Sequence, residues 1–432
     1  MPEQLMQFKA SARMKVLMSL VVLFSLFATW FVVRWYIGNT MAEYFPPDDH
    51  RLDNARIALS LAPNDPLPHW RLGDLAQRYL PPDQIHVVVT EFEKAVSLSP
   101  SDYRLWMEFG KALEQAGDFE KAEKALREAV KLAPSYSQPR WYLGNLLLRT
   151  DRYPEGFGEL RQASEADDQF QNQLFNLAWQ LNKDDLNGMR AAAGDKPGVR
   201  AAFSRYLIER GRYDDGLRLW DTLSEIEKRD SRFAADPIIK SLLSAHRYNV
   251  AMKIWNEIAP GPAYRVDYGK ILDSGFEQNL AHGPNAVFGW QVQSNSQVQL
   301  GIDANQGHSG NRSLRLYFQV RSHIDAINVT QLIPVKPNTE YSFECYLKTD
   351  RLESAETPVI VISNATDEAY LGGSERAPSG SNNWQRIAFS FKTPDKAEAI
   401  KLRMIRNTCP DSAVCPIFGT VWYDDFDLKS GK

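Results

Sequence analysis

The sequence contains few of the residues on which most enzymatic and metal chemistry depends. Its seven histidines are scattered, none at metal-ligand spacing from another, and only three cysteines occur in 432 residues. There is no G-x-S-x-G motif, no H-E-x-x-H motif and no glycine-rich loop of the kind that cradles phosphates. The residue patterns therefore offer no catalytic centre, and we predict that the protein is not an enzyme.

An excess of charge of one sign is also missing. The formal net charge is -4 and no basic tract occurs, so we expect no nucleic-acid partner. The apolar fraction of 44% and the charged fraction of 24% are those of a folded protein. The length of the chain exceeds that of one compact domain and suggests two or three.

The few cysteines are informative through their positions. Cys409 and Cys415 lie in one short segment, where a disulfide would close a small loop if the chain is exported to an oxidising compartment. The alternative is that they are two free thiols in a loop. Cys345 lies within an alternating apolar segment, and we interpret it as a small core residue.

One long hydrophobic run is present near the N-terminus. Val16–Val33 contains 18 residues without a charge, and with its flanks it is long enough to cross a hydrocarbon core of about 30 Å. A cleaved signal peptide would usually have an apolar region of about 7–15 residues followed by small residues, whereas this run is longer and ends in aromatic residues. We therefore predict an uncleaved membrane anchor.

The charges around this run predict its orientation. Three basic residues precede it and acidic residues follow it, which favours a cytoplasmic N-terminus. The predicted segments are a cytoplasmic N-terminus at 1–13, a transmembrane anchor at 14–37 and a linker at 38–49. The rest of the chain would then lie outside the cytoplasm.

A period of 34 residues follows in the middle of the chain. It relates Gly110 to Gly144 and Pro100 to Pro134, and such a period is typical of helix-turn-helix solenoids. The segment YRLWMEFGKALEQAGDFEKAEKALREAVKLAP carries small residues where two helices would approach closely and a proline that ends the second helix. This segment closely resembles the tetratricopeptide repeat (TPR) family. The resemblance implies about five or six helical repeats over residues 50–260, with a concave face that binds a protein or peptide.

Candidate binding residues follow from position alone, because the first helix of each repeat faces the concave side. They are Arg104, Glu108, Lys111, Gln138, Arg140, Tyr142 and Asn145. Six tryptophans at helical spacing favour packing between helices over a ligand-binding stripe. They are Trp70, Trp106, Trp141, Trp179, Trp220 and Trp255.

Apolar and polar residues alternate in the C-terminal part, residues 265–432, which predicts an antiparallel β-sandwich. The motifs DSGFEQ, FGWQV, GHSGNRSLRL, NNWQRIAFSFKTP and GTVWYDDFDL resemble the jelly-roll carbohydrate-binding modules of xylanases and related glycosidases. The expected fold class is thus multidomain α + β: a single transmembrane helix, an all-α TPR solenoid and an antiparallel β-sandwich (jelly roll).

The same resemblance implies a structural calcium ion, because those modules commonly carry one between their first and last strands. The matching positions are Glu277 and Asp425, with oxygens from the loop near Ser309 and Asn311. Strand alternation predicts that Asp424 points to the opposite face from Asp425. The alternative is that these acids cap turns or pair with arginines.

Glycan binding would need an outward aromatic ring with hydrogen-bond donors beside it. The candidates are Trp422, Tyr317, Arg315 and Arg403. Trp422 could instead cover a helix docked from the repeats. Trp290 and Trp384 match framework positions and are expected in the core.

Together these expectations describe a membrane-anchored scaffold in a bacterial inner membrane, with most of the chain periplasmic or extracytoplasmic. Its layout resembles proteins of polysaccharide export and envelope assembly. The alternative is a glycan-binding protein in which the repeats space the β-domain from the membrane. A third reading is a glycan-active hydrolase.

Overall fold

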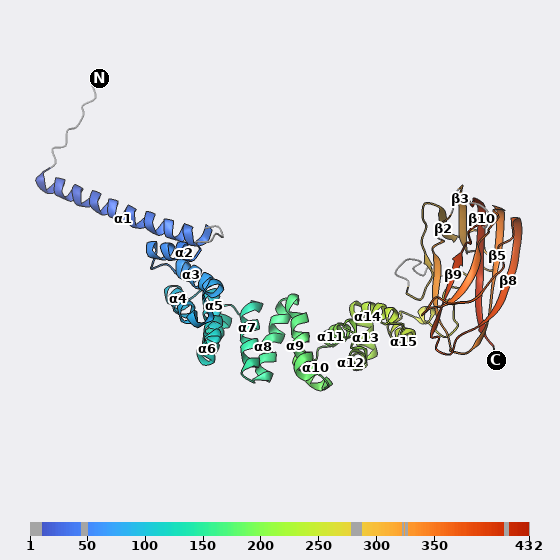
Figure 1. The fold of residues 1–432 in the computed structure, drawn as a ribbon, viewed down its shortest axis with the longest axis horizontal. Coiled ribbons are helices and arrows are strands. Elements are labelled where there is room, and N and C mark those ends of the chain that lie inside the picture. The colour runs from blue at the N-terminus through green and yellow to red at the C-terminus, as the bar shows by residue number, and fades with distance from the viewer. Residues whose placement is uncertain are drawn as a thin grey trace, which may run out of the picture. The chain divides into compact units, whose positions relative to one another are not determined.

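The structure is a computed structural model that describes residues 11–44, 51–277, 287–321, 324, 327–409 and 414–431. The chain divides into two compact units, with the boundary between Gly194 and Asp195. The first unit is helical. The second contains further helices and a β-sandwich (Figure 1).

The first unit begins with one long apolar helix, α1 (Ala12–Tyr44). Its side chains from Val16 to Val33 are almost all exposed, as an anchor in lipid would require. Among the described residues it is the one helix long and apolar enough to cross a membrane, although a signal sequence would meet the same criteria. The helix continues through Tyr44, so the part of the predicted linker from 38 to 44 is helical. The rest of that linker lies outside the described residues.

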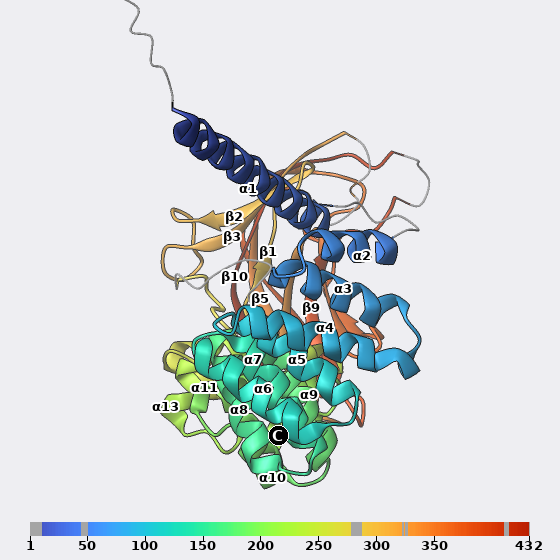
Figure 2. The same ribbon diagram turned by 90° about the vertical axis from the view of Figure 1, so that its left-hand side faces the viewer.

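The C-terminal end of α1 packs against α2 (Arg51–Leu61), as Figures 1 and 2 both show. Gly38 and Ala42 are buried there. A Cβ added to Gly38 would lie 2.9 Å from both the Ala58 carbonyl oxygen and the Ala62 Cβ, so only glycine allows this close approach. The apolar helix therefore also forms the first helix of the repeat stack.

Helix pairs continue the stack with a common geometry. The pairs are α3 (Pro66–Tyr79) with α4 (Ile85–Leu98), α5 (Tyr103–Gln115) with α6 (Phe119–Leu132), α7 (Ser137–Arg149) with α8 (Tyr153–Ala166), and α9 (Gln171–Asn182) with α10 (Leu186–Ala193). A Cβ on Gly110 or Gly144 would lie 2.7 Å from a leucine of the paired helix, Leu126 or Leu160. The short helices η1 (Pro82–Gln84) and η2 (Asp168–Phe170) lie between α3 and α4 and between α8 and α9.

The second unit begins with more helices. They are α11 (Pro197–Glu209), α12 (Tyr213–Trp220), α13 (Glu225–Asp230), α14 (Arg232–Ser244), α15 (Tyr248–Ile258) and η3 (Pro262–Tyr264). Trp220, Ile238 and Ile254 are fully buried between them. The predicted repeats up to residue 260 are therefore helical in both units.

The β-sandwich has two five-stranded sheets in which every pairing is antiparallel, as predicted. Sheet 1 has the order β1 (Gln291–Val292), β4 (Val329–Pro334), β9 (Ala399–Ile405), β6 (Val359–Asn364), β7 (Tyr370–Gly373). Sheet 2 has the order β2 (Val298–Asp303), β3 (Ser313–Val320), β10 (Ile417–Ser430), β5 (Glu340–Glu353), β8 (Gly380–Lys392). Their apolar faces enclose one core that includes Trp290, Phe318 and Phe343.

The last helix of the second unit docks onto sheet 1. The Tyr248 hydroxyl donates a hydrogen bond to the Ala365 carbonyl oxygen (2.8 Å), and the Asn249 amide donates to the Glu398 carboxylate (3.0 Å). Tyr248, Ala365 and Ala399 are buried together at this contact. The helix docked from the repeats thus covers sheet 1, not the strand β10 that carries Trp422.

Candidate functional site

The predicted calcium ligands gather around the loop between β2 and β3. Asp424 is fully buried, and its Oδ2 atom accepts hydrogen bonds from the His308 amide (2.6 Å) and the Ser309 amide (3.2 Å). The Asp425 carboxylate accepts from the Ser309 hydroxyl (2.5 Å) and contacts the His308 ring nitrogen Nδ1 (2.6 Å). The prediction that Asp424 and Asp425 point to opposite faces is wrong. A register shift in β10 and a positive φ of 49° at Asp425 turn both carboxylates toward this loop.

Glu277 holds the other side of the same loop. Its Oε1 atom accepts hydrogen bonds from the amides of Asn311 and Arg312, both at 2.8 Å. Gly310 lies beneath this carboxylate with φ at 66°, and an added Cβ there would collide with the Glu277 side chain. The structure therefore brings together all four predicted calcium-site residues. Ser309 and Asn311 direct N–H donors at the acids, whereas the sequence suggested oxygens.

Three carboxylates around one loop form a hard-oxygen donor set that suits calcium. Burial raises the pKa of Asp424 to about 6, because a buried carboxylate loses hydration, and the backbone amide donors partly offset this effect. However, no group of three His, Cys, Asp or Glu side chains within the described ranges is arranged as a metal site. The amide and hydroxyl donors of the loop already satisfy several carboxylate oxygens, so the acids also stabilise the loop without a metal.

The predicted glycan-binding residues do not form one site. Trp422, Arg315 and Tyr317 lie on the outer face of sheet 2, where Trp422 is paired with Arg315 across the strands. The Trp422 ring is half-buried, its Nε1 donates to the Asp303 carboxylate (2.9 Å), and the Lys348 ammonium lies 5.8 Å from its centroid. Arg403 lies in sheet 1. Strand alternation identifies outward residues, but it does not assign two strands to one sheet.

The outer face of sheet 2 carries an aromatic cluster that was not predicted from the sequence. The His308 ring stacks on Tyr346 at 3.7 Å between centroids, and Trp384 meets His308 edge-on at 5.7 Å. Trp384 was expected in the core, yet it lies outside the core cluster and is half-buried on this face. Trp290 is in the core as expected, with 1% exposure. Inward and outward side chains alternate along β5. Because Cys345 is buried, this alternation predicts that Tyr346 points outward.

The candidate protein-binding residues of the repeats fall into two groups. Lys111 and Glu108 of α5 form an ion pair (2.8 Å), and the Lys111 ammonium lies 4.9 Å from the centroid of the Tyr142 ring in α7. This cluster therefore connects the first helices of two successive repeats.

The other candidates have local partners or lie exposed. Arg140 pairs with Glu159 between α7 and α8 (2.7 Å), and both side chains are largely buried. Arg104 pairs with the helix-capping Asp102, and the Asn145 side chain donates to the Trp141 carbonyl oxygen. Gln138 is exposed.

Five of the six repeat tryptophans pack against residues of neighbouring helices. Trp220 is fully buried, Trp141 stacks on Phe170 at 4.7 Å between centroids, and Trp106 packs against buried residues of neighbouring helices. Trp70 and Trp255 likewise pack against core clusters. They serve mainly as interhelix core.

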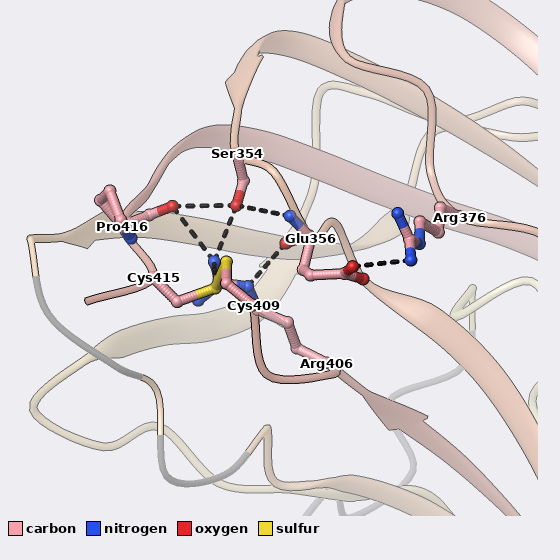
Figure 3. The surroundings of a disulfide bond; sticks show 7 residues. All are labelled: Ser354, Glu356, Arg376, Arg406, Cys409, Cys415 and Pro416. Atoms are coloured by element: carbon pink, nitrogen blue, oxygen red, sulfur yellow. Dashed lines mark hydrogen bonds and ion pairs between the residues drawn. A yellow bond between two sulfur atoms is a disulfide. The ribbon is translucent and has the colours of Figure 1, made fainter. Parts of the chain in front are cut away.

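A disulfide joins Cys409 to Cys415. Figure 3 shows the Arg406 guanidinium next to it, where Nη2 donates to the Pro416 carbonyl oxygen (3.1 Å) and the Ser354 hydroxyl (2.7 Å). Cys345 is fully buried, and burial raises the pKa of its thiol far above the usual range.

Comparison with known families agrees with this architecture. Residues 89–137 and 107–169 match the family model for the tetratricopeptide repeat, and residues 269–411 match that for a carbohydrate binding domain. The chain joins TPR repeats to a carbohydrate-binding-module-like β-sandwich. No curated protein matches it.

Several solved structures resemble parts of the chain. The MamA fragment from residue 41 to its end, from Desulfovibrio magneticus RS-1, is 14% identical, with 40% of this chain and 80% of that one covered and a TM-score of 0.26. YrrB, described as a TPR protein with an unusual peptide-binding site, is 14% identical over 49% and 95% of the chains, with a TM-score of 0.25. A structure titled "CBM4 structure and function" is 14% identical over 38% and 100%, with a TM-score of 0.29.

Proposed function

We propose that the protein is a membrane-anchored scaffold that holds protein partners at a bacterial cell envelope. The observation that carries this proposal is the shared helix α1. One end of α1 is an exposed apolar segment long enough to cross a membrane, and the other end is buried in the repeat stack through Gly38 and Ala42. Cleavage of α1 as a signal peptide would expose the apolar surface of α2. This favours an α1 helix that stays in the protein as an anchor.

Two further observations support placement of the repeats and the β-domain outside the cytoplasm. Basic residues precede the apolar segment, which favours a cytoplasmic N-terminus in the inner membrane. The disulfide between Cys409 and Cys415 is typical of an oxidising compartment. Within this setting, polysaccharide export and envelope assembly are the processes we propose for the scaffold.

The partner surface would include the cluster of Glu108, Lys111 and Tyr142. Capture from native membranes tests it, using the full chain and the double variant Lys111→Ala/Tyr142→Ala. Lys124→Ala is the matched control, because that lysine lies on α6, is 72% exposed and pairs only locally with Glu120. We expect a specific partner that is retained by the control and lost by the double variant. Equal capture by all three proteins would contradict this surface.

Glycan binding by the β-sandwich is the second candidate function. It is favoured by the family match and by a cavity of about 420 Å³ beside Arg403 in sheet 1. A glycan array with the full chain separates the two functions, because a scaffold alone would give no specific glycan signal. A hydrolase would instead release products from a bound glycan, and we expect binding without turnover.

We also propose that calcium binds at the loop between β2 and β3. Glu277, Asp424 and Asp425 would hold the ion through their carboxylates, with oxygen atoms of Ser309 and Asn311 in place of the N–H donors that these residues direct at the acids in this structure. The ion would neutralise the acidic charges and tie the segment before β1 to β10. The measurement is the melting temperature of the β-domain transition in a chelator and after calcium is restored. We expect a reversible drop that is absent in Glu277→Gln. An unchanged melting temperature in chelator would contradict calcium.

A further inference from the structure

The apolar helix α1 carries an aromatic band at the end of its exposed apolar segment. Trp30, Trp35 and Tyr36 are each at least half exposed. Tryptophan and tyrosine favour the boundary between hydrocarbon and headgroups, because their rings combine an apolar body with a polar group. Arg34 lies within this band and is the first charged residue after the apolar segment. With α1 across a membrane, the band would lie in the headgroup layer.

The end of α2 and the turn that follows it contact this same band. The Trp35 ring nitrogen Nε1 donates a hydrogen bond to the Asp65 carboxylate (2.8 Å). The Arg34 guanidinium donates to the carbonyl oxygen of Ser60, in the last turn of α2. Asp65 is also fixed to α3, because it caps that helix by accepting from the Leu67 amide (3.0 Å). The aromatic band is therefore linked directly to the connection between α2 and α3.

Close helix packing holds the turn beside the band. A Cβ on Gly38 would lie 2.9 Å from the Ala58 carbonyl oxygen of α2, and α1 is one continuous helix through both the band and this contact. Gly38 follows Arg34 by four residues, a rise of about 6 Å. The headgroup layer extends about 5–8 Å beyond the hydrocarbon on each side of a bilayer. The packed contact between α1 and α2 therefore begins at the level of the headgroups.

The residues of the turn suit a polar, hydrated layer. Pro63 and Asn64 are exposed, and Asp65 is the only charged residue from 60 to 65. Its carboxylate already accepts hydrogen bonds from α1 and α3. Arginine forms strong hydrogen bonds with phosphates and has five N–H donors, of which the contact of Arg34 with α2 uses one. A lipid phosphate would thus meet a cationic donor beside a polar turn.

We propose that the turn between α2 and α3, residues 62–65, is seated in the headgroup layer of the membrane that α1 spans. Its partner is the phospholipid headgroup, with a phosphate bound by Arg34. The first helix pair is then fixed at the bilayer surface, so the repeat stack begins at the membrane and not at the end of a flexible tether. This inference rests on the proposed anchor and adds a second membrane contact to it.

Depth-dependent fluorescence quenching of the full chain in phospholipid nanodiscs tests the proposal. The described native cysteines are buried or paired, so one introduced thiol can carry an environment-sensitive fluorophore. The labelled variants are Asn64→Cys in the turn, Phe24→Cys in the apolar segment and Lys124→Cys on α6 as the control. The quenchers are phospholipids that carry a nitroxide on the headgroup or in the middle of the acyl chain. Circular dichroism confirms that each variant is folded.

We expect the headgroup nitroxide to quench Asn64→Cys more strongly than the acyl-chain nitroxide does. Phe24→Cys should show the reverse order, and Lys124→Cys should be quenched by neither. Adding Trp35→Phe removes the hydrogen bond to the turn and should reduce the quenching of Asn64→Cys. Trp30→Phe is the matched control, because it makes the same change in the aromatic band and should leave that quenching unchanged.

The phosphate contact of Arg34 has its own test. Arg34→Gln removes the positive charge, whereas Arg34→Lys keeps it. Headgroup quenching of Asn64→Cys should fall in Arg34→Gln and recover in part in Arg34→Lys. Equal quenching in these two variants would contradict recognition of a lipid phosphate by Arg34.

Three results would overturn the proposal in distinguishable ways. Absence of acyl-chain quenching of Phe24→Cys would mean that α1 lies outside the bilayer, which removes the anchor and this inference together. Quenching of Phe24→Cys without quenching of Asn64→Cys would keep the anchor and remove the seated turn. Strong headgroup quenching of Lys124→Cys would mean that the repeats lie along the membrane and do not contact it through this one turn.

Discussion

At the scale of single residues, the loop between β2 and β3 contains one backbone position that strongly favours glycine. Gly310 combines a φ of 66° with a position beneath the Glu277 carboxylate. A side chain at such a φ costs roughly 1–2 kcal/mol before any collision is counted. We therefore expect Gly310→Ala to lower the free energy of unfolding of the β-domain by at least about this amount, measured by urea denaturation.

Gly301→Ala is the control for this change. Gly301 lies in β2 with no atom within 4 Å of an added Cβ and no positive φ. Its substitution should leave stability nearly unchanged. If both variants have the same stability, the loop does not depend on the conformation of Gly310.

The environment of His69 predicts that the stability of the repeats depends on pH. Burial disfavours its charged form, but hydrogen bonds to Glu91 (2.7 Å) and to the Pro63 carbonyl oxygen (3.0 Å) outweigh burial and raise its pKa above 6.5. Because the folded pKa is raised, the stabilisation is fully present below about pH 6.5 and is lost as pH rises through the folded pKa.

Thermal unfolding at about pH 5.5 and about pH 8.5 measures this effect. The melting temperature of the wild type should be higher than that of His69→Gln, and this difference should be larger at the lower pH. The same difference at both values would mean that the His69–Glu91 contact contributes no charge-dependent stability.

At the scale of elements, the junction of α1 and α2 is the critical contact. A Cβ on Gly38 would approach the backbone of Ala58 and Ala62 at 2.9–3.1 Å. Gly38→Val should therefore separate the two helices and destabilise the first repeat by about 1–3 kcal/mol, as overpacking of a core does. Limited proteolysis within α2 measures the effect.

Gly158→Ala is the matched control for the helical glycines, because an added Cβ there meets nothing within 4 Å. It should be neutral or stabilising by up to about 1 kcal/mol, since alanine favours helices. Unchanged protection of α2 in Gly38→Val would mean that α1 and the repeats are joined only through the chain.

Periodicity made most elements predictable. The 34-residue spacing identified α5 to α8, because close helix packing requires a small residue at the same place in each repeat. Alternation identified β3, β5 and β10, because each strand has one face in the core. The helix pair of α1 and α2 was not predicted, since the apolar composition of α1 hides the packing role of Gly38.

The candidate sites were predicted less completely than the elements. Motif resemblance placed Glu277, Asp425, Ser309 and Asn311 around one loop, since these motifs lie at meeting strand ends. The bulge at Asp424 and Asp425 depends on a backbone conformation that strand alternation does not reveal. Arg406 had no sequence signal, because its position follows from contacts with distant segments near Ser354 and Pro416.

At the scale of the whole molecule, the account combines three parts with separate roles. We propose that the apolar helix anchors the chain in a membrane and that the repeats bind protein partners, with glycan binding by the β-sandwich as the second candidate function. The units contain separate candidate sites, so partner capture and glycan binding should be lost independently. Lys111→Ala/Tyr142→Ala should leave glycan affinity unchanged, and Arg403→Gln should leave partner capture unchanged.

The most direct test of the central claim is the side of the membrane on which the repeats lie. The native cysteines in the described structure are buried or paired, so a single Lys124→Cys substitution offers an exposed thiol to a membrane-impermeant maleimide in bacterial spheroplasts. We expect rapid labelling of Lys124→Cys in intact spheroplasts, whereas Gln7→Cys, in the predicted cytoplasmic segment, should react only after permeabilisation. Protection of Lys124→Cys together with labelling of Gln7→Cys would contradict the proposed topology and the envelope function.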